Sequence, residues 1–186
     1  FYVYEVTGFD ADGAFTYSDE RVVAGSYLPT YTYGLSLGGN YKNVDFSVDT
    51  YGVGGNKLYN GKKAQRFGGE NIEYDILDDF WTPSTPNAAN PRPSNDVPRA
   101  STYFIEKGDY LRINNITVGY TFKDVFEGLD KVRLYATAVN PFLFTKFSGF
   151  SPEIVGNDNA NPLGGAGIEL DAYPTNKTFL FGLSVG

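Results

Sequence analysis

The stretch from residue 30 to residue 51 alternates between two kinds of side chain, and no other feature constrains the fold as strongly. Large apolar groups occupy one parity: Tyr31, Tyr33, Leu35, Leu37 and Tyr41. Small or polar groups occupy the other: Thr30, Thr32, Gly34, Ser36, Gly38 and Asn40. After Lys42 and Asn43 the alternation resumes, with Val44, Phe46 and Val48 against Asp45, Ser47 and Asp49. A period of two with one apolar face predicts two half-buried β-strands, at 30–41 and 43–52.

These two strands form a hairpin if Lys42 and Asn43 make a two-residue turn. Tyr41 then faces Val44, and Leu37 faces Val48. In this register apolar residues oppose apolar residues and polar residues oppose polar residues along the whole pair.

The ends of the apolar face carry aromatic rings, while its middle carries leucines. From Tyr31 to Tyr41 the chain makes ten steps of about 3.3 Å. With a tilt of about 40° such a strand spans roughly 25 Å along a membrane normal, which is the height of the apolar band of outer-membrane barrels. The pattern therefore favours a strand with lipid on one side and water on the other. The alternative is a soluble β-sandwich, whose core favours Val, Ile and Leu over terminal Tyr.

Further strands are predicted at 109–122, 131–141 and 177–186, with the end of another at 1–9. In 109–122 the apolar parity changes between Ile113 and Ile116, so we interpret Asn114-Asn115 as a β-bulge that restores the face. The predicted connections alternate in length. They are short at 42–43 and 123–130, and long at 10–29, 53–108 and 142–176, as in barrels with short turns on one side and long loops on the other. Since about eight strands are needed to close a barrel, five or six strands predict part of a larger one.

Composition excludes several classes of function. The net charge is −7, which gives nucleic acid no basic patch to bind. The chain has no Cys and no His, which removes thiolate chemistry, histidine acid–base catalysis and most zinc sites. No stretch approaches the 18 apolar residues of a transmembrane helix. The chain begins at Phe1-Tyr2-Val3 without an initiator Met, and we expect it to be an interior piece of a longer protein.

Several runs of residues together resemble a known family. They are Leu28–Leu35, Asn40–Phe46, Asp109–Tyr120, with the sequence DYLRINNITVGY, and Phe147–Glu153, with the sequence FSGFSPE. The chain resembles the C-terminal end of SusC/RagA-type TonB-dependent outer-membrane transporters of Bacteroidota. The resemblance implies an all-β fold, in which residues 1–186 supply C-terminal antiparallel strands of a 22-stranded transmembrane barrel. The plug domain and the TonB-contacting segment of that family are not found in this sequence.

The resemblance also implies a function. We expect a protein of the bacterial outer membrane that is not an enzyme and that imports oligosaccharides, or alternatively peptides, under a SusD-like surface lipoprotein lid. Energy would come from the TonB complex through the absent N-terminal part. Two other classes stay open: a secreted β-sandwich carbohydrate-binding module, and a glycosidase that uses a carboxylate pair such as Asp45 and Asp49.

The long segment 53–108 carries the aromatic candidates for contact with a ligand or a lid. They are Tyr59, Trp81, Tyr103 and Phe104, with Arg66 nearby. Rings beside polar groups are typical of sugar or peptide sites. The alternative for each is packing of the loop against itself or against the lid. Trp81, the only Trp, is the best single candidate.

An acidic segment follows the first predicted strand. If Gly13 is the sharp turn of a Ca²⁺ loop, then Asp10, Asp12 and Asp19 fall at ligand positions three, five and twelve. Position one would be Gly8, which has no side-chain oxygen. The pattern therefore favours a plain acidic turn, with a Ca²⁺ site as the alternative.

Overall fold

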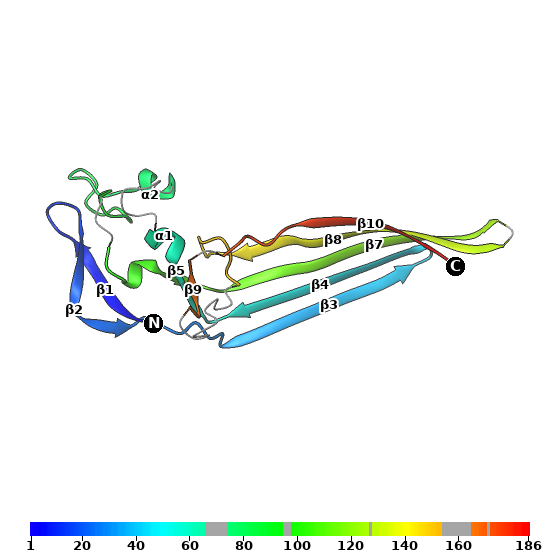
Figure 1. Cartoon of the computed structure of the whole chain (residues 1–186), viewed down its shortest axis with the longest axis horizontal. Coiled ribbons are helices and arrows are strands. Elements are labelled where there is room, and N and C mark those ends of the chain that lie inside the picture. Colours follow the sequence, from blue (N-terminus) through cyan, green and yellow to red (C-terminus); the bar gives the residue numbers. More distant parts are fainter. Residues whose placement is uncertain (66–73, 95–97, 127, 154–164, 171) are drawn as a thin grey trace. The chain divides into compact units, whose positions relative to one another are not determined.

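The computed structural model of the chain describes residues 1–65, 74–94, 98–126, 128–153, 165–170 and 172–186 (Figure 1). The chain divides into two units. The sheet unit comprises Thr30–Gly54, Asp109–Lys146 and Pro174–Gly186. The loop unit comprises Phe1–Pro29, Gly55–Gly108 and Phe147–Tyr173.

The sheet unit is one antiparallel five-stranded sheet with the order β10-β8-β7-β4-β3 (Figure 1). Its strands are β3 (Tyr31–Tyr41), β4 (Val44–Gly54), β7 (Tyr110–Phe126), β8 (Leu129–Thr145) and β10 (Thr178–Val185). The fold class and these five predicted strands are confirmed. The connection predicted at 123–130 is shorter in the structure, because β7 and β8 continue to pair as far as Phe126 and Leu129.

The hairpin of β3 and β4 turns at Lys42 and Asn43, with Lys42 at a positive φ of 57°. The predicted pairs Tyr41 with Val44 and Leu37 with Val48 are confirmed. The prediction that apolar opposes apolar along the whole pair is wrong beyond Leu37. There, the residues opposite Leu35, Tyr33 and Tyr31 are Thr50, Gly52 and Gly54.

The glycines of β4 have a packing reason. A Cβ on Gly54 would lie within 2.7 Å of three side-chain atoms of Tyr31, and a Cβ on Gly52 would lie 2.4 Å from Tyr33 Cζ. Each ring therefore lies over a glycine of the neighbouring strand, a known device that compensates for the missing side chain. The Tyr33 hydroxyl also donates to the Tyr110 carbonyl on β7 at 3.2 Å.

The predicted bulge is confirmed. Asp49 and Thr50 of β4, adjacent in sequence, pair with Asn115 and Ile113, so Asn114 is the extra residue. Strand β8, on the other side of β7, is irregular at the same level: Asn140 and Pro141 are unpaired in the β7–β8 register, and Asn140 has a φ of 51°. Because this insertion in β8 has two residues, the apolar side chains of β8 point to the same face of the sheet before and after it.

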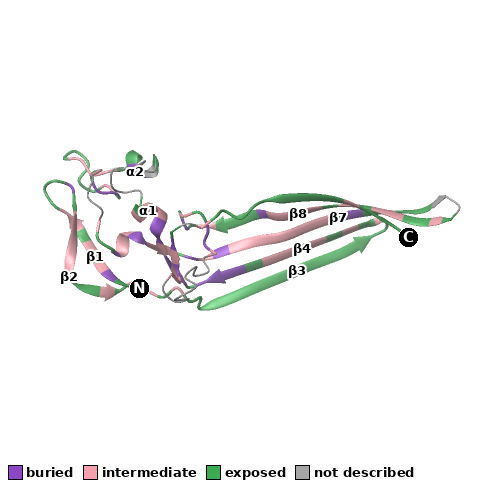
Figure 2. Cartoon of the chain, in the orientation of Figure 1, coloured by how far each residue is buried: buried purple, intermediate pink, exposed green. Residues whose placement is uncertain are grey.

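As a result one face of the sheet is apolar across all five strands. It is formed on β3 and β4 by Tyr31, Tyr33, Leu35, Leu37, Tyr41, Val44, Phe46 and Val48, and on β7, β8 and β10 by Leu111, Ile113, Ile116, Val118, Tyr120, Phe122, Val132, Leu134, Phe142, Phe144, Phe179, Phe181, Leu183 and Val185. Many of these side chains are exposed, up to 84 % for Phe181. Figure 2 shows this exposure along β3 and β10. An exposed apolar surface of this extent marks contact with lipid or with protein.

The loop unit holds the remaining elements. An antiparallel pair joins β1 (Tyr2–Phe9) and β2 (Phe15–Val23), and a small sheet has the order β6-β5-β9. The bounds of the rest are β5 (Lys57–Asn60), α1 (Gly61–Gln65), α2 (Tyr74–Asp78), η1 (Thr102–Phe104), β6 (Ile105–Lys107) and β9 (Ile168–Glu169). Its buried side chains include Val3, Leu58, Ile76, Phe104 and Phe147.

The strand predicted at 1–9 is confirmed as β1. The long connections predicted at 10–29, 53–108 and 142–176 contain strands that the sequence analysis missed: β2 in the first, β5 and β6 in the second, and β9 in the third. Strand β2 has Asp19, Glu20 and Arg21 in succession and lacks an apolar parity, so it gives no periodic signal. No helix among the described residues has the length and apolar character to cross a membrane.

Substituting Gly52 by Ala should destabilise the sheet unit by about 1–3 kcal/mol, because the new methyl group overlaps Tyr33 and the Tyr110 carbonyl at 2.6 Å. Gly34→Ala is the matched control, since its Cβ meets only the Thr50 carbonyl at 3.4 Å. Urea unfolding in detergent micelles measures both. Equal midpoints for the two variants would contradict the packing of the Tyr33 ring over Gly52.

Candidate functional site

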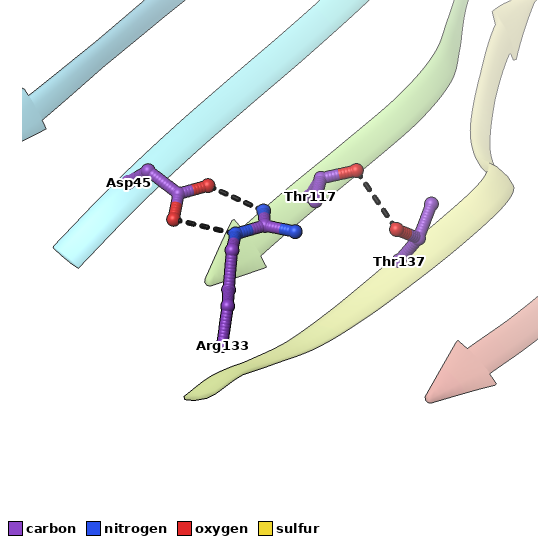
Figure 3. Close-up of polar contacts among 4 residues, drawn as sticks. All are labelled: Asp45, Thr117, Arg133 and Thr137. Atoms are coloured by element: carbon purple, nitrogen blue, oxygen red, sulfur yellow. Dashed lines mark hydrogen bonds and ion pairs between the residues drawn. The ribbon is translucent and has the colours of Figure 1, made fainter. Parts of the chain in front are cut away.

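The face of the sheet opposite the apolar one carries the charged and hydroxyl side chains, with the larger apolar residues Tyr51, Val53 and Leu143 toward one end, and we call it the polar face. Its charged centre is an ion pair between strands that are not neighbours. Arg133 of β8 reaches across β7 to Asp45 of β4 (Figure 3). Its Nε donates to Asp45 Oδ2 at 2.9 Å and its Nη2 donates to Oδ1 at 2.5 Å, a bidentate arrangement. The pair therefore joins β4 and β8 through side chains across the intervening β7.

Two glycines make room for this arrangement. A Cβ on Gly119 of β7 would lie 2.5 Å from Asp45 Oδ2 and 2.6 Å from Arg133 Nη2, so only glycine fits beneath the pair. The Arg133 guanidinium also lies over the Tyr135 ring at 4.8 Å from its centroid. Tyr135 in turn covers Gly182 of β10, where a Cβ would lie 2.1 Å from Tyr135 Cζ. The result is an ordered polar and aromatic strip from β4 to β10.

The same face carries a hydroxyl pair, Thr117 and Thr137, whose oxygens are 2.8 Å apart (Figure 3). It also carries Asp49, opposite Ser36 on β3 and Asn115 on β7. The carboxylate pair considered for a glycosidase, Asp45 and Asp49, is thus unequal, since Asp45 is held by a guanidinium. The polar face offers hydrogen-bonding groups to water or to another molecule.

In the loop unit three of the four predicted aromatic residues, Tyr59, Tyr103 and Phe104, form a connected cluster. The rings of Tyr59 and Phe104 are 5.6 Å apart, and those of Phe104 and Tyr103 are 5.0 Å apart. Phe15 of β2 extends the cluster, with its ring 4.7 Å from that of Tyr103. The Lys63 ammonium lies 3.7 Å from the Tyr103 centroid.

Burial separates these candidates. Phe104 is 0 % exposed, so in this structure it packs inside the loop unit. Tyr59 is half-buried, and burial raises the pKa of its phenol. Tyr103 is also half-buried, and its hydroxyl donates to Asn90 Oδ1 at 2.6 Å. The packing interpretation therefore fits Phe104 well.

Trp81 is half-buried and lies against the acidic turn. A Cβ on Gly13 would be 2.3 Å from Trp81 Cε3, and the backbone N–H of Trp81 donates to the Asn90 carbonyl at 2.8 Å. The ring thus holds the turn while part of it stays accessible. Arg66, the remaining candidate, lies outside the described residues.

The acidic segment is a turn capped by its own first carboxylate. Asp10 Oδ1 accepts the backbone N–H groups of Asp12 and Ala14, both at 2.9 Å. Gly13 has a φ of 80°, as the sharp turn requires. Across the described part of the chain no three acidic side chains gather in a way that could hold a metal ion. The Ca²⁺ site at Asp10, Asp12 and Asp19 remains an untested prediction.

A polar knot that the sequence did not reveal joins three distant segments of the loop unit. Asn60, 0 % exposed, donates to Glu106 Oε1 at 3.0 Å and to Ser148 Oγ at 2.8 Å. The Ser148 N–H donates to Glu106 Oε2 at 2.8 Å. Ser148 belongs to the FSGFSPE run, so this knot gives that run a structural role. No spacing in the sequence signals partners 42 and 88 residues apart.

Glu169 lies beside this knot and is fully buried. Among the described residues neither carboxylate oxygen has a hydrogen-bond partner of good geometry. Burial raises the pKa of this carboxyl, and the backbone N–H and charge of Lys62 offset the effect only in part. Compared with water, the site therefore shifts the equilibrium of this carboxyl toward its protonated form.

Curated proteins similar to this chain are TonB-dependent receptors. TonB-dependent receptor P26 of Formosa agariphila is 31 % identical over 179 residues, and TonB-dependent receptor SusC of Bacteroides thetaiotaomicron is 32 % identical over 170 residues. These alignments cover 90 % and 82 % of this chain but 18 % and 14 % of the relatives. The chain thus spans less than a fifth of their length. No protein-family model matches.

Solved structures show the same fold. A structure of the RagAB peptide transporter matches with a TM-score of 0.79 and 23 % identity, covering 100 % of this chain and 22 % of that chain. The RagAB peptide importer in its closed-closed state matches with a TM-score of 0.75 and 22 % identity. The described strands therefore correspond to a portion of that barrel.

Replacing Glu169 by Gln should make the protein more stable at neutral pH than the wild type, with no gain below about pH 4.5, near the ordinary pKa of Glu. Because the folded-state pKa is raised, the folded protein binds more protons than the unfolded one between the two pKa values. Wild-type stability therefore falls as pH rises through that window, whereas a neutral amide does not titrate.

The measurement is the urea midpoint of both proteins between pH 4 and pH 7. Glu20→Gln, at an exposed residue of β2, is the control and should show no such trend. A gain for Glu169→Gln that is the same at every pH would contradict the titration of the buried carboxyl.

Proposed function

Because the chain is part of a SusC/RagA-type TonB-dependent receptor, we propose that its sheet unit is a section of barrel wall in a receptor that imports oligosaccharides across the outer membrane. TonB-dependent receptors are outer-membrane β-barrel proteins and act as transporters rather than enzymes. Peptides are the alternative substrate class. The observation that carries the proposal is the difference between the two faces of the five-stranded sheet: one is apolar across all five strands, and the other carries the charged and hydroxyl side chains.

This division fits a wall between lipid and water. Leu, Val, Ile and Phe side chains project from the apolar face, where hydrocarbon chains would surround them, and tyrosines lie at both ends of β3. The polar face, with its Arg133–Asp45 pair and its threonines, would line the water-filled interior. A soluble sandwich would have to cover the apolar face with a second sheet.

A SusD-like surface lipoprotein is the partner that we propose for the extracellular side. In this arrangement the loop unit supplies polar and aromatic groups toward substrate and lid, and the sheet supplies no chemistry. The driving energy would come from the TonB complex. Peptide transport is a property of RagAB, and at 23 % identity the likeness of this chain to RagAB concerns the fold alone.

In cells that lack the receptor, the uptake of fluorescent oligosaccharides should fall at least about tenfold, since such solutes do not cross the outer membrane by themselves. Uptake should also vanish without TonB. Labelled tryptic peptides are the matched probe. Loss of peptide uptake with oligosaccharide uptake intact would assign the receptor to peptides. A receptor that stays monodisperse without detergent would contradict the membrane barrel.

Substituting Leu37 by Arg should destabilise the barrel by about 2–4 kcal/mol, the cost of a cation near the middle of the lipid face. Ser36→Arg is the matched control, because Ser36 is adjacent in β3 and points to the opposite face. Urea unfolding in lipid vesicles compares the two. A larger loss for Ser36→Arg would reverse the assignment of the faces.

A further inference from the structure

A pocket of about 400 Å³ lies in the loop unit beside the tip of the β1–β2 hairpin. One part of its wall comes from the β1–β2 turn and the start of β2, and the other part comes from the described residues Pro91, Arg92, Ser94, Pro98 and Arg99. The side chains with binding chemistry are Asp10, Asp12, Phe15, Tyr17, Arg92 and Arg99. Among the sequence candidates only the two aspartates, considered for Ca²⁺, fall here.

The walls of the pocket are held in place by contacts that leave its charged groups available. Asp10 caps the turn, and the Arg92 N–H donates to the Gly13 carbonyl at 2.9 Å. Trp81 also packs against Gly13. The backbone of both walls is therefore fixed without use of the Arg92 guanidinium or the Asp12 carboxylate.

The two arginines indicate the chemical class of the ligand. Neither forms an ion pair with a residue that the structure describes, although acidic residues outnumber basic ones by 22 to 15 in the chain. The Arg99 guanidinium lies 5.5 Å and 5.9 Å from the ring centroids of Tyr4 and Tyr17. Stacking on rings orients a guanidinium and leaves its N–H groups free to bind a planar or tetrahedral anion.

Aromatic and acidic groups complete the set. Phe15 and Tyr17 are half-buried and offer apolar surface. Burial raises the pKa of the Tyr17 phenol, and the backbone N–H and charge of Arg99 lower it in part, so the hydroxyl stays protonated at neutral pH. The exposed Asp12 carboxylate accepts hydrogen bonds from hydroxyl groups.

A second hollow of about 550 Å³ shares Phe15, Tyr17 and Arg99 with the first and adds Tyr4 and Asp19. The two hollows therefore have a common wall at these three residues. The ligand proposed below would extend from the first hollow into the second. This continuity fits a chain of several sugar units better than a single small anion.

We propose that this pocket binds a negatively charged sugar unit of an oligosaccharide. Arg92 and Arg99 pair with its carboxylate or sulfate group, its ring lies against Phe15 and Tyr17, and Asp12 accepts its hydroxyl groups. The inference rests on the proposed import of oligosaccharides and adds to it the charge of the substrate. Both forms of the ligand carry an anionic group on a sugar ring. The experiment below distinguishes a carboxylate group from a sulfate group.

The test is calorimetric titration of the full-length receptor in detergent with three trisaccharides and one tripeptide. The trisaccharides are tri-galacturonate, a sulfated galactose trisaccharide and neutral maltotriose, and the tripeptide is triglutamate. We expect one of the two anionic trisaccharides to bind at least tenfold more tightly than maltotriose and triglutamate. Arg92→Gln should weaken that binding at least tenfold, and Arg92→Lys should weaken it less. Arg92 is exposed, so these variants should fold.

Arg21→Gln is the matched control, since Arg21 is an exposed arginine of β2 that lies over Tyr2 and Tyr4 and does not line the first pocket. Its effect on binding should stay within twofold. Equal losses for Arg92→Gln and Arg21→Gln, equal binding of maltotriose, tighter binding of triglutamate, or no binding of either anionic trisaccharide would each overturn the inference. If the receptor still imports neutral oligosaccharides into cells, the proposed function stands and only this inference fails. If the receptor imports no oligosaccharide, the proposed function is wrong as well.

Discussion

The hydrogen-bond ladder between neighbouring strands is the constraint on which the sheet depends. In a ladder each residue is fixed opposite one partner, and side chains alternate between the faces, so a slip of one residue would exchange the two faces. The structure meets this constraint where the strands are irregular. Asn114 is one extra residue on β7, and Asn140 with Pro141 are two on β8, and after both insertions Ile113 and Phe142 are paired on the apolar face. The irregularities therefore bend the strands without mixing the faces.

Within this frame, glycines let large side chains cross from strand to strand. Tyr33 covers Gly52 on the apolar face, and on the polar face Arg133 passes over Gly119 to reach Asp45. In each case the missing Cβ is filled by a group from the neighbouring strand. The sheet thereby gains lateral side-chain contacts in addition to its backbone bonds, which matters for a wall that has little packing on its apolar side.

Periodicity made the five long strands predictable, because each repeats its signal over at least eight residues. The same reasoning could not find β2, whose polar stretch at Asp19-Glu20-Arg21 hides the alternation, or β9, which has two residues. The aromatic candidates show a second limit. Tyr103 and Phe104 are adjacent and chemically alike, but Phe104 is fully buried whereas Tyr103 reaches Asn90 and Lys63. Which of these two neighbouring side chains is buried depends on η1 and its tertiary contacts, which the local sequence pattern does not reveal.

The two units treat their charges in opposite ways, and this difference suggests where selectivity arises. On the polar face of the sheet Arg133 is neutralised by Asp45 and covered by the strip that continues through Tyr135 to Gly182. The ion pair itself therefore adds no net charge to this face. In the loop unit Arg92 and Arg99 share a pocket with Asp10 and Asp12 but form no ion pair with them. An anionic ligand would gain from guanidinium groups that form no ion pair with the described residues.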